Sequence, residues 1–149
     1  MDHVIRPSVV AYRDIDFSWM VGRKVASVTF HEPVLWHIII GSDATIGVGC
    51  LWRIIEQNRI VLTSEDHLQK FGLPAPIDAA ERATEFLSRI TIQSVQLHEA
   101  TADLVLDFTS EIRVEILPNS SGYESWQLRD PNGTSYVAQG GGQICVWQS

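Results

Sequence analysis

The sequence has few positive charges and no long uninterrupted apolar run. Its 149 residues hold 11 Lys and Arg against 18 Asp and Glu, which gives a net charge of -7. An acidic chain is repelled by nucleic-acid phosphates and by anionic lipid surfaces, which argues against either as a partner. No apolar stretch approaches the roughly 20 residues of a membrane-spanning helix, and charges between Asp2 and Asp16 interrupt any signal-like segment. We therefore expect a cytoplasmic protein.

Cysteine and recognisable catalytic motifs are also scarce. Cys50 and Cys145 lack CxxC spacing and lie in apolar segments, which predicts two buried free thiols and leaves a disulfide or reactive thiol as the alternative. HExxH, HxH and GxSxG do not occur. Glu65, Asp66 and His67 form the densest polar cluster, which we interpret as a loop or the start of a helical turn. The sequence thus assigns no catalytic residue, metal ligand or cofactor.

Hydrophobic residues make up 45% of the chain, too much for disorder and enough for a core. The length suits one domain over 1–149, with 1–20 as an N-terminal extension packed on the sheet. Period-two alternation of apolar and polar residues predicts about nine or ten short strands. These strands are 25–30, 34–40, 44–52, 59–63, 90–97, 104–108, 112–116, 123–129, 136–139 and 144–147.

The segment 78–89 has helical periodicity instead. Asp78 occupies the N-cap position and Glu81 follows three residues later, the spacing of a capping box. Apolar residues then recur along one helical face. We predict an α+β, mostly β fold: an antiparallel meander sheet curled into a sandwich or a partly open barrel, with one helix. A flatter sheet crossed by the helix is the alternative.

Matching apolar faces of neighbouring strands predicts a local register around a loop at 31–33. This register sets His37 between Ser27 and Gly47 on one face, with Gly49 beside Gly47. Two glycines on one face of a strand leave a shallow trough that accommodates a ligand or a partner side chain. Sheet curvature or close helix packing is the other explanation for such glycines.

The strands 104–108 and 112–116 form the clearest hairpin pattern. Shared faces pair Leu106 with Val114 across a loop at 109–111, and Val105 then points outward. We therefore expect Leu106→Asp to be severe and Val105→Asp to be mild. The outer face carries four acidic residues around Arg113, namely Asp103, Asp107, Glu111 and Glu115. This face either docks a basic protein partner or is simply solvated.

Three motifs in the C-terminal third carry a family resemblance. They are a Gly-Tyr-Glu-x-Trp segment at 122–126, a Pro-x-Gly turn at 131–133 and a glycine-rich closing turn at 140–142. Val-Gly-Arg-Lys-Val at 21–25 looks like the opening of the same proteins. From about 19 to 147 the chain resembles a family of small uncharacterised bacterial β-rich proteins, some of them candidate immunity proteins for bacterial toxins. The resemblance implies a stoichiometric binder and carries no catalytic residue.

Two functional hypotheses follow. The first is a non-catalytic binding protein, in one form an immunity-type toxin inhibitor, which meets a basic protein at the acidic hairpin or at Tyr123, Glu124 and Trp126. The second is a small-ligand-binding or enzymatic β-fold with its pocket near His37 or Tyr123. The sequence leaves a homodimer open.

Overall fold

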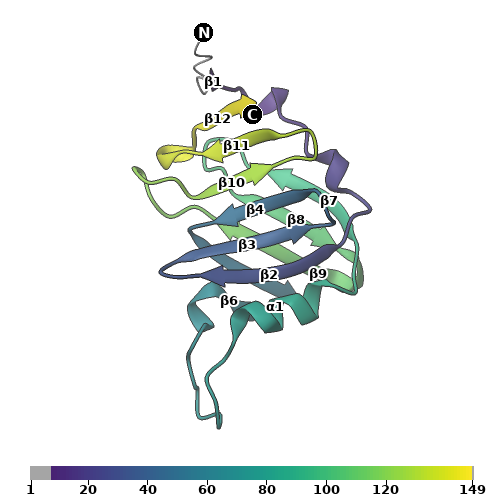
Figure 1. The fold of residues 1–149 in the computed structure, drawn as a ribbon, viewed down its shortest axis with the longest axis vertical. Coiled ribbons are helices and arrows are strands. Elements are labelled where there is room, and N and C mark those ends of the chain that lie inside the picture. The colour runs from purple at the N-terminus through teal and green to yellow at the C-terminus, as the bar shows by residue number, and fades with distance from the viewer. Residues whose placement is uncertain (1–7, 149) are drawn as a thin grey trace.

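Two antiparallel β-sheets face one another in a computed structural model that describes residues 8–148 (Figure 1). The larger sheet contains β1 (Ser8–Val9), β2 (Val25–His31), β3 (Leu35–Ile40), β4 (Ala44–Val48), β10 (Trp126–Arg129), β11 (Thr134–Ala138) and β12 (Ile144–Gln148). The smaller sheet contains β5 (Leu51–Glu56), β6 (Arg59–Thr63), β7 (Ile92–Leu97), β8 (Leu104–Phe108) and β9 (Ile112–Leu117). One helix, α1 (Ala79–Leu87), accompanies the short turns η1 (Tyr12–Asp14), η2 (Ser18–Met20), η3 (Ser64–Asp66), η4 (Thr109–Glu111) and η5 (Gly140–Gly142).

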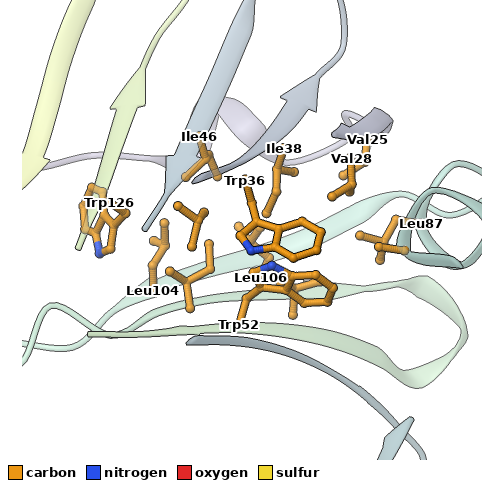
Figure 2. Close-up of a cluster of buried hydrophobic side chains, with 14 of the residues drawn as sticks. Val25, Val28, Trp36, Ile38, Ile46, Trp52, Leu87, Leu104, Leu106 and Trp126 are labelled. Atoms are coloured by element: carbon orange, nitrogen blue, oxygen red, sulfur yellow. The ribbon is translucent and has the colours of Figure 1, made fainter. Parts of the chain in front are cut away.

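The strand order defines a sandwich and not a barrel. The seven-stranded sheet runs β1-β12-β11-β10-β4-β3-β2, and the five-stranded sheet runs β6-β5-β9-β8-β7. The predicted α+β, mostly β sandwich with one helix is confirmed, with two more strands than the upper prediction of ten. The hydrophobic core lies between the two sheets. There the ring of Trp36 on β3 meets the ring of Trp52 on β5 edge to face, with centroids 5.0 Å apart (Figure 2).

The segment 44–52, predicted as one strand, is two strands in different sheets. Gly49 and Cys50 carry the chain from β4 to β5, and the Gly49 N–H donates to the Ser125 carbonyl at 2.8 Å. The alternation continues across the break because both sheets turn their inner faces to the same core. Val48 and Trp52 are consequently both buried, and the pattern carries no sign of the crossing.

The register of the first hairpin differs from the prediction. Val28 lies opposite Ile38, and a β-bulge between Val25 and Ser27 precedes this pair. The bulge buries Val25 and exposes Ala26, which was expected in the core. The turn accordingly falls at 32–34. The next register, β3 with β4, is as predicted, with the pairs Trp36–Val48 and Ile38–Ile46.

Helix α1 begins at the predicted cap. The Asp78 Oδ1 accepts from the Glu81 N–H at 3.1 Å, which satisfies one of the free donors of the first turn. The buried face of the helix, with Ala79, Ala83 and Leu87, closes the side of the sandwich against β2 and β6. The periodicity of the sequence was sufficient to predict this helix, because the contacts that form a helix join residues close together in the chain.

Each outer strand of the two sheets is short, bulged or covered. The Thr84 Oγ1 of α1 accepts from the Val28 N–H at 2.9 Å and lies 3.3 Å from the Val28 carbonyl oxygen. The Thr84 side chain thus covers the edge of β2 at Val28. The first residue of β7, Ile92, exchanges hydrogen bonds with residues 22–23 and precedes a β-bulge between Ile92 and Ser94. The edge strand β6 is irregular, because its register with β5 shifts between the partners of Ile54 and Ile55. The edge strand β1 is short, with only two residues.

The described part of the N-terminal extension, residues 8–20, packs on the larger sheet. β1 pairs with β12, and the Tyr12 hydroxyl donates to the Gly142 carbonyl. Phe17 meets the Tyr136 ring edge to face at 5.0 Å and covers part of the inner face. The first seven residues of the predicted extension lie outside the described part of the chain.

The two cysteines are free thiols in different environments. Cys50 is buried, and burial raises the pKa of its thiol to about 12, whereas Cys145 is half-buried. The prediction of two buried thiols therefore holds for Cys50 alone. A pKa of about 12 leaves about one thiolate in ten thousand at pH 8, and the thiolate is the reactive form.

We expect a thiol reagent at pH 8 to modify Cys145 first and Cys50 only on a much slower timescale. Mass spectrometry of peptides sampled during the reaction measures both rates. Addition of urea should bring the Cys50 rate up to the rate of Cys145. Rapid labelling of Cys50 in the folded protein would contradict its burial.

Candidate functional site

A trough lies on the outer face of the larger sheet, over β3, β4 and β10. At its centre Gly47 pairs with His37 on one side and with Gln127 on the other. The trough has a volume of about 340 Å³. Its lining combines aliphatic, amide and charged groups: Leu35, His37, Thr45, Gly47, Gly49, Glu124, Ser125, Trp126, Gln127 and Arg129. The structure thus joins the two regions that the sequence suggested separately, around His37 and around Glu124.

The glycines of the trough have ordinary backbone conformations and room above them. A Cβ built on Gly47 would meet the nearest atom, Cδ2 of His37, at 3.5 Å, and one on Gly49 would meet the Ser125 carbonyl oxygen at 3.7 Å. Both distances are normal van der Waals contacts, and neither residue has a positive φ. Neither backbone strain nor close packing therefore requires glycine at these two positions.

His37 is half-buried and lies beside a second histidine, His31. Burial, followed by the neighbouring His31, lowers the pKa of His37 below its usual value of 6.5. The two imidazole rings lie with centroids 4.8 Å apart, and His31 in turn lies 3.3 Å from the Thr29 hydroxyl. A neutral imidazole both donates and accepts hydrogen bonds, so His37 suits polar groups of either kind in the trough.

Ser27 does not belong to this site. The shifted register places Thr29 opposite His37, whereas Ser27 pairs with Ile39. Ser27 stays on the outer face of the sheet but is absent from the trough lining. The position of the turn is the physical reason, because a turn at 32–34 instead of 31–33 moves every pair between the turn and the bulge by two residues.

Tyr123, Glu124 and Trp126 have three different positions. Tyr123 is 81% exposed and Glu124 lines the trough. The Trp126 residue borders the trough but is only 2% exposed, and its indole Nε1–H donates to the Ala102 carbonyl at 2.8 Å. Trp126 consequently anchors β10 to the opposite sheet and offers no indole to a partner at the surface.

Two of the four acidic side chains on the hairpin face form ion pairs with arginines. Asp107 lies opposite Arg113 as predicted, at 2.7 Å from the Arg113 Nε, and Glu115 lies 2.7 Å from the Arg53 Nε. The Glu115 side chain is only 17% exposed, and Asp103 is half-buried rather than exposed. These contacts leave the face with less free negative charge than the sequence indicated. Val105, which lies between Asp103 and Asp107 on the same strand face, is likewise buried, at 4% exposure.

The Asp66-His67 cluster has a structural role. The Asp66 carboxylate accepts from the Thr63 N–H at 2.9 Å and completes a capping box on η3. The His67 Nδ1 accepts from the Ala79 N–H at 3.1 Å and caps α1. Within residues 8–148, no group of three His, Cys, Asp or Glu side chains is placed to hold a metal ion.

The sequence alone did not indicate Thr45, Gln127 or Arg129 as part of the site. Thr45 lies on β4 two residues before Gly47, whereas Gln127 and Arg129 join the site through the pairing of β4 with β10, two strands far apart in the chain. Comparisons with known protein families, curated proteins and solved structures found no match for this chain. In the described part of the chain, no helix combines the length and apolar character needed to cross a membrane.

Proposed function

We propose that the chain is a non-catalytic binding protein whose partner docks in the trough over Gly47. Gly47 on β4 carries this proposal, and Gly49 lies beside it in the crossing between the sheets. Glycine within a strand destabilises it by about 0.5–1 kcal/mol relative to alanine. β4 is an interior strand of the seven-stranded sheet, where this cost is felt, and no clash or positive φ accounts for glycine there. The absence of a side chain at Gly47 keeps the surface open above the strand.

The shape of the trough favours a protein segment over a small molecule. Small-molecule sites enclose most of their ligand in a concave cavity. This trough lies along an outer sheet face, and its polar groups are spread over three strands. The second hypothesis, a small-ligand-binding or enzymatic site near His37, shares the same location and is tested by the same variants.

The charge of the chain supports a basic protein as the partner. A net charge of -7 accelerates association with a basic protein through long-range attraction. An immunity-type inhibitor of a bacterial toxin, acting in the cytoplasm, is the form of this proposal that the family resemblance implies. Because Asp107 and Glu115 are paired with arginines, we place the docking surface at the trough and not at the hairpin.

The decisive variant is Gly47→Val, which fills the trough with a β-branched side chain. We expect the free energy of unfolding to rise by about 0.5–1 kcal/mol, since valine favours a strand and meets no close neighbour. A phage-displayed peptide library selected on the unmodified protein supplies the binding probe. Calorimetry should then show a Kd at least about tenfold weaker for Gly47→Val.

Ser27→Val is the matched control, because it adds valine to the same sheet face outside the trough. It should leave the Kd of the selected peptide within about twofold of the unmodified value. Equal affinity of the peptide for the Gly47→Val variant and the unmodified protein would overturn the proposal. A selected small molecule that binds the trough while all peptides fail would favour the second hypothesis.

A further inference from the structure

A second concavity lies at the end of the sandwich, between the β2–β3 turn and the beginning of the β6–α1 connection. We call it the end cleft. Its volume is about 370 Å³, and Phe30, Trp36 and Leu51 contribute apolar walls. Two exposed apolar residues also line it: Val34 from the β2–β3 turn and Leu68 from the β6–α1 connection. We call these two residues the lips of the cleft. In Figure 1 the β6–α1 connection projects beyond both sheets, and Leu68 and Gln69 at its beginning line the cleft.

The two lips are apolar side chains that the folded protein leaves in water. Val34 is 64% exposed and Leu68 is 63% exposed. Leu68 also has a φ of +66°, a conformation that disfavours residues with a Cβ other than Asn and Asp. The backbone of Leu68 is nevertheless held in place, because its N–H donates to the Ile77 carbonyl at 2.8 Å. The cleft therefore has a fixed and exposed apolar rim.

His67 gives the end cleft a polar group of known hydrogen-bonding sense. Its Nδ1 accepts from the Ala79 N–H, so the neutral ring carries its hydrogen on Nε2. Among residues 8–148, no partner receives a hydrogen bond from this Nε2. The ring is oriented by contacts with Phe30 at 4.7 Å and Trp36 at 5.2 Å between centroids. Nε2 is thus a pre-oriented donor for a molecule that fills the cleft.

The charge of the lining favours a basic occupant. Glu65 lines the end cleft, and its lining contains no lysine or arginine. Gly49 lines both the end cleft and the trough, so the two concavities meet at the crossing between the sheets.

We propose that the end cleft binds a segment of a protein partner that presents an apolar side chain next to a lysine or arginine. The apolar side chain packs between Val34 and Leu68, a backbone carbonyl of the segment accepts from the His67 Nε2–H, and the basic group meets Glu65. This inference rests on the proposed function as a binding protein and extends its interface beyond the trough.

The test uses two synthetic peptides, acetyl-Lys-Leu-Lys-Leu-Lys-amide and its Glu-for-Lys counterpart, titrated into the ¹⁵N-labelled full chain. We expect the lysine peptide to shift the amide signals of Val34, Leu51 and Leu68, which line the end cleft and not the trough, in a saturable manner with a Kd of about millimolar. The glutamate peptide should bind at least about fivefold more weakly, because it meets Glu65 with like charge. Unmoved cleft signals with the lysine peptide, or equal binding of both peptides, would overturn the inference.

Variants separate binding from folding. Leu68→Asn removes a lip and suits the positive φ, so the melting temperature should stay level or rise while the lysine peptide binds at least about fivefold more weakly. Val21→Asn, at another exposed apolar residue outside the cleft, is the control and should keep the affinity. Wild-type affinity in the Leu68→Asn variant would contradict the assignment of the lip.

Two substitutions divide the roles of His67. Asparagine can replace the Nδ1 acceptor and lacks a group at Nε2, so His67→Asn should keep the α1 cap and lose affinity for the peptide. Glutamine reaches the Nε2 position, so His67→Gln should lower stability and keep more of the affinity. Unchanged affinity for the peptide in His67→Asn would show that His67 acts only as a cap.

The outcome is independent of the trough. If Gly47→Val leaves selected peptides unaffected while the lysine peptide still shifts the cleft signals, the trough proposal fails and the cleft stands. If peptides shift trough signals alone, the inference about the cleft fails and the proposed function stands.

Discussion

Leu106→Asp is expected to unfold the protein or reduce its stability by at least about 4 kcal/mol. Leu106 is fully buried on the inner face of β8, opposite Val114. A carboxylate there loses its hydration without a partner, and the loss is comparable to the total stability of a domain, about 5–15 kcal/mol. Urea denaturation followed by circular dichroism measures this loss of stability. A variant that is already unfolded without urea will show no folded baseline.

Val105→Asp is the companion variant on the outer face of the same strand. Its expected cost is about 2–3 kcal/mol, larger than the alternating pattern suggested, because Val105 is only 4% exposed. The new carboxylate would also lie beside Glu115 on the neighbouring strand. Equal losses for Val105→Asp and Leu106→Asp would contradict the assignment of the two faces.

Gly142→Ala is expected to cost at least about 3 kcal/mol. Gly142 ends the turn η5 with a φ of +86°, and an added Cβ would lie 1.8 Å from the Ala100 carbonyl oxygen. That separation is far too short, so either the turn η5 or the loop that contains Ala100 must move. A shift of η5 would also disturb the hydrogen bond that the Tyr12 hydroxyl donates to the Gly142 carbonyl. The midpoint of urea denaturation reports the change.

Gly141→Ala is a matched control in the same turn. Gly141 also has a positive φ, +80°, but its added Cβ would meet the nearest atom at 3.7 Å. Only the conformational cost of about 1–2 kcal/mol should appear. If both alanines reduce stability equally, the contact between η5 and Ala100 is not the cause.

Elements governed by local patterns were predictable from the sequence. The 104–116 hairpin has its predicted loop and the predicted Leu106–Val114 pair, since one apolar face fixes the register. The cap at Asp78 is local in the same sense. The first hairpin was not predictable in full, because the bulge after Val25 inserts a residue that the apolar pattern does not reveal.

Half of the trough could likewise be predicted. Gly47 and His37 lie on consecutive strands, and their pairing follows from the β3–β4 register. Gln127 reaches Gly47 only because β10 inserts beside β4 after a long excursion through the other sheet. His67 was noticed as polar, but its bond to Ala79 depends on the path of the intervening loop, which no periodicity describes.

The hydroxyl of Thr84 has a consequence for crowded solutions of this protein. An open sheet edge is a template on which a second copy adds a strand, and repeated addition leads to fibrils. Thr84 occupies the hydrogen-bonding groups of Val28 on β2, and a bulge interrupts the regular spacing on β6. Thr84 therefore removes one pairing position from the edge of β2, and we expect a Thr84→Val variant to aggregate more readily on concentration than the unmodified chain.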